Sequence, residues 1–236
     1  MTTDLLIALI TLVSLEIILG IDNVIFISIL SEKVPENQRD KLRKMGIGFA
    51  MIMRLILLTA ISYIMKLEQT LFAIQDIEIS GKDLILISGG VFLIYKSTKE
   101  IYEKTENDHA ELDLKKTKKA SFKDSLLQIL VLDIVFSIDS IITAVGMVDN
   151  LYIMYAAVII SVGVMMLASG AISKFIHDHP SFKILALCFL IVIGISLIAE
   201  GFDHGIPKAY IYCSMAFAFL VDVIQMQTAK PKKRKS

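Results

Sequence analysis

Seven apolar runs divide the chain, and short polar segments separate them. The runs cover residues 5–30, 46–65, 83–99, 125–147, 151–173, 183–200 and 207–226. A helix needs about 20 apolar residues to cross the hydrocarbon core of a bilayer, so the pattern predicts seven transmembrane helices. Residues 67–80 mix apolar and acidic positions, and we expect them to form an interfacial segment or a re-entrant loop.

Two of these runs contain a pair of acidic residues, and the two pairs have the same spacing. The four acids are Glu16, Asp22, Asp133 and Asp139. A polar residue and two aliphatic residues follow the second acid of each pair, and these polar residues are Asn23 and Ser140. A carboxylate near the centre of a span costs about 2.5 to 3.5 kcal/mol on insertion scales. The pairs therefore predict a duplicated polar site inside the membrane.

The two motifs are 117 residues apart, with two predicted helices between them. The first and fourth helices therefore run in opposite directions, as in the inverted three-plus-three repeats of many secondary transporters. This predicts an all-α polytopic membrane protein with a first repeat (1–100), a charged cytoplasmic linker (101–124), a second repeat (125–200) and a seventh helix with a basic tail (201–236). Both third elements end at an acid, Glu100 and Glu200, which suggests equivalent positions in the two repeats.

Helix geometry restricts how the acids can meet. A spacing of six residues places Glu16 and Asp22 about 120° apart and about 9 Å apart along the axis. Packing around a pseudo-twofold axis predicts that Glu16 pairs in depth with Asp139, and Asp22 with Asp133. One ion is shared by all four acids if the helices bend at Gly20 and Ser137. Otherwise the ion passes from one level to the other.

Arg54 is the one strong cation inside an apolar run. It is either a static partner that neutralises an acid or a charge that fills the site when the transported cation leaves. Asp222, near the inner end of the seventh run, needs no special role but is also a possible partner for Arg54.

The residue types in the spans favour hard divalent cations, which prefer oxygen ligands, whereas zinc and copper sites usually include His or Cys. No histidine lies inside a predicted span; the four are His109, His177, His179 and His204. Cys188 and Cys213 lie in apolar runs, where we expect small hydrophobic residues and neither a disulfide nor a thiolate site. We expect the eleven methionines to be packing residues.

Composition supports a membrane protein, since 55% of the residues are hydrophobic and mean hydropathy is +0.68. Basic residues gather in the loops after the first, third and fifth runs and in the tail, which predicts an outside N-terminus and a cytoplasmic C-terminus. We expect the tail to fix topology and contact anionic lipid, and no binding to nucleic acid. Asp4 replaces the basic segment of a signal peptide, so we expect the first run to be retained.

Four segments resemble the TerC family of bacterial membrane proteins, named for tellurite resistance. They are LEIILGIDNVIFIS, KDLILISGGVFLIYK, LDIVFSIDSIITAVGM and HGIPKAYIYCSMAF. The chain departs from the family pattern at Lys82, where relatives have Arg, and at Asp222, where they often have Glu. The resemblance implies a LysE-like transporter architecture in the bacterial inner membrane and, for several members, export of Mn²⁺. It implies metal contacts on Glu16, Asp22, Asn23, Asp133, Asp139 and Ser140.

The leading interpretation is a divalent-cation exporter, most simply for Mn²⁺, with the proton as the natural coupling ion because carboxylates that release a metal can take up protons. An alternative is a membrane scaffold for a stress-response or secretion complex. The least favoured is an intramembrane aspartyl protease, whose two acids share one proton. Four acids in two matched pairs argue against the protease, so we expect no enzyme and no cofactor besides the transported cation.

Overall fold

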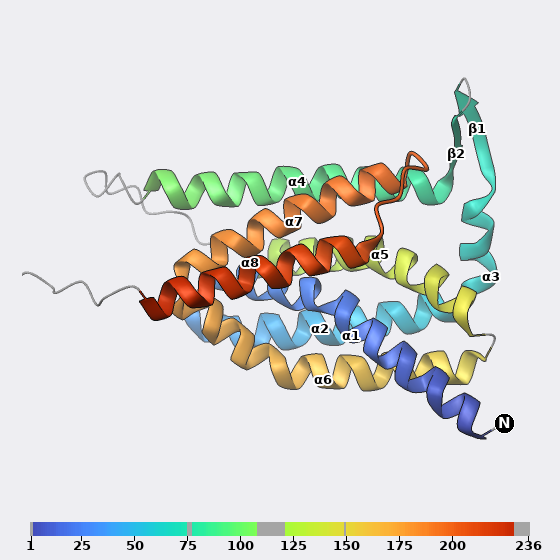
Figure 1. The fold of residues 1–236 in the computed structure, drawn as a ribbon, viewed down its shortest axis with the longest axis horizontal. Helices are drawn as coiled ribbons and strands as arrows, with labels where there is room; N and C mark the ends of the chain where they lie inside the picture. The colour runs from blue at the N-terminus through green and yellow to red at the C-terminus, as the bar shows by residue number, and fades with distance from the viewer. Residues whose placement is uncertain (1, 75–76, 108–120, 149, 229–236) are drawn as a thin grey trace, which may run out of the picture.

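The computed structural model describes residues 2–74, 77–107, 121–148 and 150–228. Within them lie seven long helices, one short helix, a 3₁₀ turn and a β-hairpin. Their bounds are α1 (Thr2–Glu32), α2 (Glu36–Thr59), α3 (Ile61–Ile64), η1 (Met65–Glu68), β1 (Thr70–Ile74), β2 (Ile77–Ser80), α4 (Gly81–Asn107), α5 (Phe122–Met147), α6 (Leu151–Asp178), α7 (Pro180–Glu200) and α8 (Lys208–Thr228). The long helices lie along one another in an elongated bundle (Figure 1).

The prediction of an all-α polytopic membrane protein is confirmed. Five helices, α1, α5, α6, α7 and α8, are long and apolar enough to cross a membrane. The helices α2 and α4 are comparable in length but carry charged residues in their terminal turns. The start of α1 and the end of α8 lie at opposite ends of the bundle (Figure 1), as an odd number of crossings requires.

Several boundaries differ from the prediction. The second helix ends at Thr59, and the chain continues through Ala60 into α3 and η1. The strands β1 (Thr70–Ile74) and β2 (Ile77–Ser80) pair antiparallel, with Ala73 opposite Glu78, at the end of the bundle near α3 (Figure 1). Of the two expected forms, this position agrees with an interfacial segment and not with a re-entrant loop, and β-branched and aromatic residues there favour strands.

The linker between the two repeats is shorter than predicted. Helix α4 continues to Asn107 and α5 begins at Phe122, so part of segment 101–124 is helical, and residues 108–120 lie outside the described part of the chain. Helix α6 also extends beyond its predicted end at residue 173, which places His177 in its last turn instead of in a loop.

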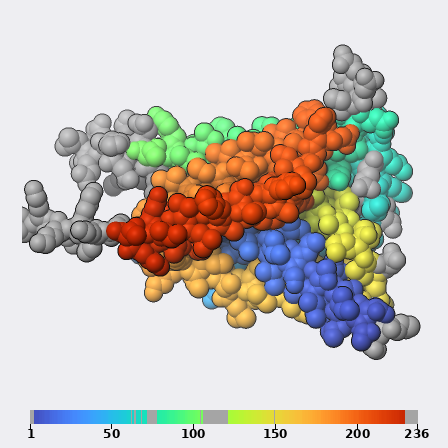
Figure 2. Space-filling view, in the orientation of Figure 1, coloured from blue at the N-terminus to red at the C-terminus, as the bar shows by residue number. Residues whose placement is uncertain are grey.

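Helix packing has the pattern of an inverted repeat. The helix α1 packs on α6 and α2 packs on α5, while α1 meets α5, α2 meets α6, and α4 meets α7. Exchanging α1 with α5, α2 with α6 and α4 with α7 leaves these five contacts unchanged, whereas the contacts of α1 with α2 and of α6 with α7 have no comparable counterpart. The helix α8 has no counterpart and packs mainly on α7. It lies along the outside of the bundle (Figure 2).

The crossing of α4 and α7 is centred on two glycines. A Cβ atom on Gly90 would lie 2.5 Å from the carbonyl oxygen of Gly194, and one on Gly194 would lie 2.9 Å from the carbonyl oxygen of Gly90. This reciprocal contact fixes how the two third helices meet. The equivalence of Glu100 and Glu200 in the two repeats stays a prediction.

Candidate cation site

All four acids of the repeated motif are buried, with exposed fractions of 3% for Glu16, 4% for Asp22, 4% for Asp133 and 7% for Asp139. The helices α1 and α5 carry them as uninterrupted helices. The charge on a buried carboxylate requires a nearby cation or hydrogen-bond donors. The structure provides these partners at two separate places.

The first place is centred on Arg54 of α2, whose exposed fraction is 2%. Its Nη1 atom lies 2.5 Å from Glu16 Oε2, and its Nε atom lies 3.6 Å from Asp133 Oδ1. Asp133 also accepts hydrogen bonds from Ser137 Oγ at 3.2 Å and Asn23 Nδ2 at 3.5 Å. Arg54 is therefore the counter-charge of one acid from each motif. We call this set the arginine level.

The second place is formed with α7 and α8. Lys208, the first residue of α8, forms an ion pair with Asp139, and its Nζ atom lies 4.0 Å from Glu200 Oε2. The Tyr212 hydroxyl donates a hydrogen bond to Asp22 Oδ2 at 3.5 Å. We call these five residues the lysine level.

Lys208, Tyr212 and Glu200 belong to the site although the sequence motifs did not predict them. Lys208 and Tyr212 belong to the helix outside the repeat, so the motif spacing does not reveal them. A signal was present, because Lys208 is a cation at the start of an apolar run and directly follows Pro207. A lysine at that position can extend its ammonium group along the helix end.

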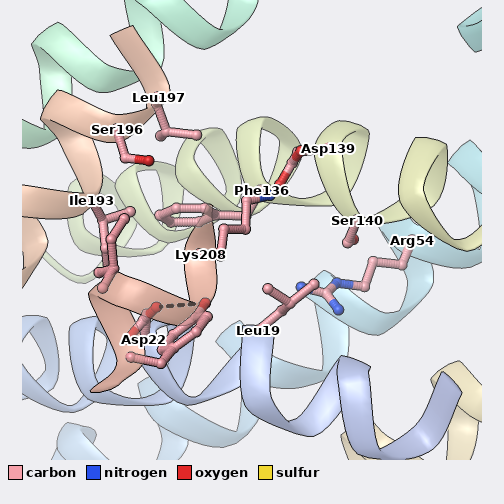
Figure 3. A pocket seen from close by; sticks show the side chains of 12 residues that line it. Leu19, Asp22, Arg54, Phe136, Asp139, Ser140, Ile193, Ser196, Leu197 and Lys208 are labelled. Atoms are coloured by element: carbon pink, nitrogen blue, oxygen red, sulfur yellow. Dashed lines mark hydrogen bonds and ion pairs between the residues drawn. The ribbon is translucent and has the colours of Figure 1, made fainter. Parts of the chain in front are cut away.

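A cavity of about 40 Å³ lies at the lysine level and also reaches Arg54. Its polar and charged lining residues are Asp22, Arg54, Asp139, Ser140, Ser196, Lys208 and Tyr212. These residues belong to α1, α2, α5, α7 and α8. Figure 3 shows the labelled side chains around the cavity, with the contact of Asp22 drawn as a dashed line. A void needs about 10 to 15 Å³ to hold one water molecule, so this one has room for a few waters or for an ion that keeps part of its hydration shell.

The predicted residues divide between the two levels. Asp22, Asp139, Ser140 and Arg54 line the cavity. Glu16, Asn23 and Asp133 do not line it, and Glu16 borders a separate void of about 10 Å³ that Ile141 and Ala144 of α5 also line. Within the described residues, no three His, Cys, Asp or Glu side chains are grouped closely enough to hold a metal ion. This conformation therefore does not bring four acids around one ion.

The contacts between α1 and α5 have the predicted antiparallel register, but the acids do not share partners in the predicted pairs, which were Glu16 with Asp139 and Asp22 with Asp133. Arg54 instead joins Glu16 to Asp133, and the cavity is lined by Asp22 and Asp139. Asn23 meets Asp133, and Glu16 lies near Ile141 and Ala144. Gly20 allows close packing, since a Cβ atom there would lie 2.4 Å from Met165 Sδ. The α-helix continues without interruption through this glycine.

The remaining candidate residues lie outside the site. Asp222 accepts a hydrogen bond from Ser181 at 3.4 Å, while the ion pairs of Arg54 are with Glu16 and Asp133. Cys188 and Cys213 are free thiols. His177 lies 3.4 Å from Glu32 at the end of the bundle, and His109 falls outside the described residues.

An ion-pair network joins α1, α4 and α7 at the end of the bundle predicted to be cytoplasmic. Lys33 pairs with Glu100 and with Glu103, the latter at 2.9 Å. Lys183 lies 2.8 Å from Glu32 and 3.8 Å from Glu100. Burial lowers the pKa of Lys33, but hydrogen bonds to Glu100 and Glu103 outweigh it and hold that pKa above its ordinary value. The hydrogen bond from Lys33 lowers the pKa of Glu103. We call this set the inner network.

The comparisons with known proteins agree on one family. The model of the family described as integral membrane protein TerC family matches residues 1–236. The chain is 50% identical to the UPF0053 inner membrane protein YgdQ of Escherichia coli strain K12, over 93% of the chain and 91% of YgdQ. It is 50% identical to a UPF0053 protein of Haemophilus influenzae, over 96% of the chain and 95% of that protein. It is also 49% identical to YoaE of Escherichia coli strain K12, over 91% of the chain and 41% of YoaE. No solved structure matches the chain.

Proposed function

The chain belongs to the TerC family of integral membrane proteins, and from this premise we propose that it is a transporter that exports a divalent metal cation, most simply Mn²⁺, across the bacterial inner membrane. The observation that carries the proposal is the cavity between the two halves of the repeat, lined by Asp22 and Asp139. Carboxylate and hydroxyl oxygens are suitable ligands for Mn²⁺. The names of YgdQ and YoaE, both called inner membrane proteins, support the membrane assignment.

The charge of the lysine level matches this cargo. Three carboxylates, those of Asp22, Asp139 and Glu200, stand against the single ammonium of Lys208. With the three carboxylates and Lys208 ionised and Tyr212 neutral, the level is two charges negative, which a divalent cation neutralises. Arg54 also lines the cavity, but its ion pairs are with Glu16 and Asp133. The Ser140 side chain lines the same cavity and offers a further oxygen.

The arginine level supplies the second position on the route. Arg54 joins Glu16 to Asp133 and also reaches the cavity. A cation that moves from Asp139 and Asp22 toward Glu16 and Asp133 must displace the guanidinium group, which would then face the vacated acids. We therefore propose that the ion passes between two levels while one half of the repeat rocks against the other. Protons taken up by vacated carboxylates would couple the return step.

The orientation is part of the proposal. The connections from α1 to α2 and from α6 to α7 lie with the end of α8 at one end of the bundle, and the start of α1 lies at the other (Figure 1). Basic loops stay in the cytoplasm, so we propose an outside N-terminus and a cytoplasmic C-terminus. A reporter fused after Ser236 that is active only outside the cytoplasm would contradict this orientation.

The test of function is the metal content of cells. Deleting the gene should raise cell-associated Mn²⁺ under Mn²⁺ challenge, and overexpression should lower it, as measured by mass spectrometry of washed cells. Overexpression of an Asp22→Asn variant at equal membrane abundance is the matched control and should not lower Mn²⁺. A change in another ion with Mn²⁺ unchanged would redirect the substrate. No change in any metal would favour the scaffold instead.

A further inference from the structure

Lys208 lies between two carboxylates in the lysine level. It is ion-paired with Asp139, and its Nζ atom lies 4.0 Å from Glu200 Oε2. About a third of the Lys208 side chain is exposed, against a tenth of the Asp139 side chain. The ammonium group thus stands between a buried acid and a more exposed one.

The helix that carries Lys208 has few other attachments. Its candidate span is only 6% buried, and Ile211 is its one buried side chain among the described residues. It lies on the outside of the bundle (Figure 2). Its polar contacts with α1 and α5, the helices that carry the repeated motif, are those of Tyr212 with Asp22 and of Lys208 with Asp139. The start of α8 is therefore held at the acids that line the cavity.

We propose that Lys208 is a tethered substitute for the transported cation: its ammonium group neutralises Asp139 when the cavity holds no metal, and it moves to Glu200 when a divalent cation binds. The proposal rests on the proposed function and adds a residue from outside the repeat that sets cation affinity.

The Lys208 ammonium group and a bound metal cation compete for the Asp139 carboxylate. A cation that binds Asp139 must displace the Lys208 ammonium, since both need the same oxygens. Leaving the displaced ammonium without a partner would be costly, but Glu200 is already within 4.0 Å of it. A small rotation of the flexible lysine side chain then completes the exchange, and the reverse rotation helps to expel the metal.

The test measures Mn²⁺ binding to the purified full-length protein in detergent. Lys208→Gln should bind Mn²⁺ about tenfold more tightly, since it removes a competing and partly solvent-screened charge. Its maximal transport rate in proteoliposomes should fall, because the empty carrier lacks its substitute cation. Lys208→Arg should keep wild-type-like affinity. Lys174→Gln, which changes an exposed lysine on α6, should alter neither quantity.

A double-mutant cycle distinguishes movement of Lys208 to Glu200 from a general electrostatic effect of Glu200 on the bound metal. Glu200→Gln should weaken Mn²⁺ binding in the wild-type background, because Lys208 then has no second partner. The same change should have little effect when Lys208 is already Gln. Equal weakening in both backgrounds would mean that Glu200 acts only through its charge, and this would overturn the exchange.

The remaining outcomes are also decisive. If wild type neither binds nor moves Mn²⁺ or another divalent cation, the proposed function fails. If wild type binds but Lys208→Gln binds no more tightly, only the role of Lys208 fails, and it is then an anchor for α8. If Lys208→Gln does not fold, Glu200→Gln is compared with Asp203→Asn, an exposed acid at the same end of the bundle. Exchange predicts weaker binding for Glu200→Gln alone, and equal effects would overturn it.

Discussion

Gly90 and Gly194 touch backbone to backbone where α4 crosses α7. Because a Cβ atom on Gly90 would lie 2.5 Å from the Gly194 carbonyl oxygen, Gly90→Ala should force the two helices apart. Overpacking of this kind costs about 1 to 3 kcal/mol, so we expect a lower melting temperature of the purified protein in detergent. Gly163→Ala is the control, since nothing lies within 4 Å of its Cβ position. Equal melting of wild type and Gly90→Ala would contradict the close crossing.

The repeat could be predicted from the sequence because each motif carries the same costly feature, a pair of acids in an apolar helix. The way in which the third helices of the two halves, α4 and α7, meet could not be predicted from the sequence. The motif helices are offset by 117 residues, whereas Gly90 and Gly194 are offset by 104. The first half has a longer connection before its third helix, made of α3, η1 and the hairpin, while His179 alone separates α6 from α7. A connection of changed length shifts the numbering without changing the packing.

The partners of the acids were predictable only in part. Arg54 stands out because a buried arginine in an apolar run needs a carboxylate. Which acids it would bind depends on how α2 packs between α1 and α5. Lys208 and Tyr212 were missed because the bundle places the start of α8 against α1 and α5. The position of Lys208 at the start of an apolar run marks it as unusual, but it does not show which acids it meets. The apolar pattern locates the spans, whereas tertiary packing decides which buried charges meet.

Arg54 should be essential for stability as long as its two acids keep their charges. Arg54→Gln leaves Glu16 and Asp133 buried without their cation, and removing one partner of a buried pair costs about 3 to 5 kcal/mol. We expect a large loss of thermal stability and of detergent-extracted monodisperse protein. Adding Glu16→Gln to Arg54→Gln should recover part of that loss, because one uncompensated charge disappears. Additive losses would show that Arg54 supports the fold through packing alone.

The inner network predicts a pH-dependent stability. The raised pKa of Lys33 contributes stability that is present below its unfolded pKa and is lost as pH rises through the folded one. The lowered pKa of Glu103 contributes stability that is present above its unfolded pKa, about 4.3, and is lost as pH falls through the folded one. The network should therefore stabilise the protein at neutral pH.

Lys33→Gln tests this network directly. Because Lys33 and Glu103 are partly exposed, we expect a loss of about 1 kcal/mol or less at pH 7. The difference in melting temperature between wild type and Lys33→Gln should narrow at pH 4, where protonation of Glu103 begins to remove the partner. Lys174→Gln should melt like wild type at both pH values. A difference that stays constant with pH would mean that Lys33 stabilises the fold without this ion pair.

The cavity acids should be required for transport and dispensable for insertion. Asp22→Asn and Asp139→Asn keep side-chain size but remove a charged ligand. Losing even an outer-shell partner of a metal ligand costs about 10- to 100-fold in affinity, so Mn²⁺ flux into proteoliposomes should fall by at least that range at low Mn²⁺. Membrane insertion should be unimpaired, because removing a charge from the bilayer centre makes insertion easier.

The matched control for these variants is Asp222→Asn, which changes an acid on α8 whose hydrogen bond is with Ser181, away from the cavity. Asp222→Asn should transport normally. A loss of flux in Asp22→Asn and Asp139→Asn would then result from the position of these acids in the cavity and not from the loss of any one negative charge. The two losses should also differ in kind. Asp139→Asn releases Lys208 from its ion pair, whereas Asp22→Asn keeps that pair and removes only the acceptor of the Tyr212 hydroxyl. Normal flux in both variants would exclude the cavity as the route of the cation.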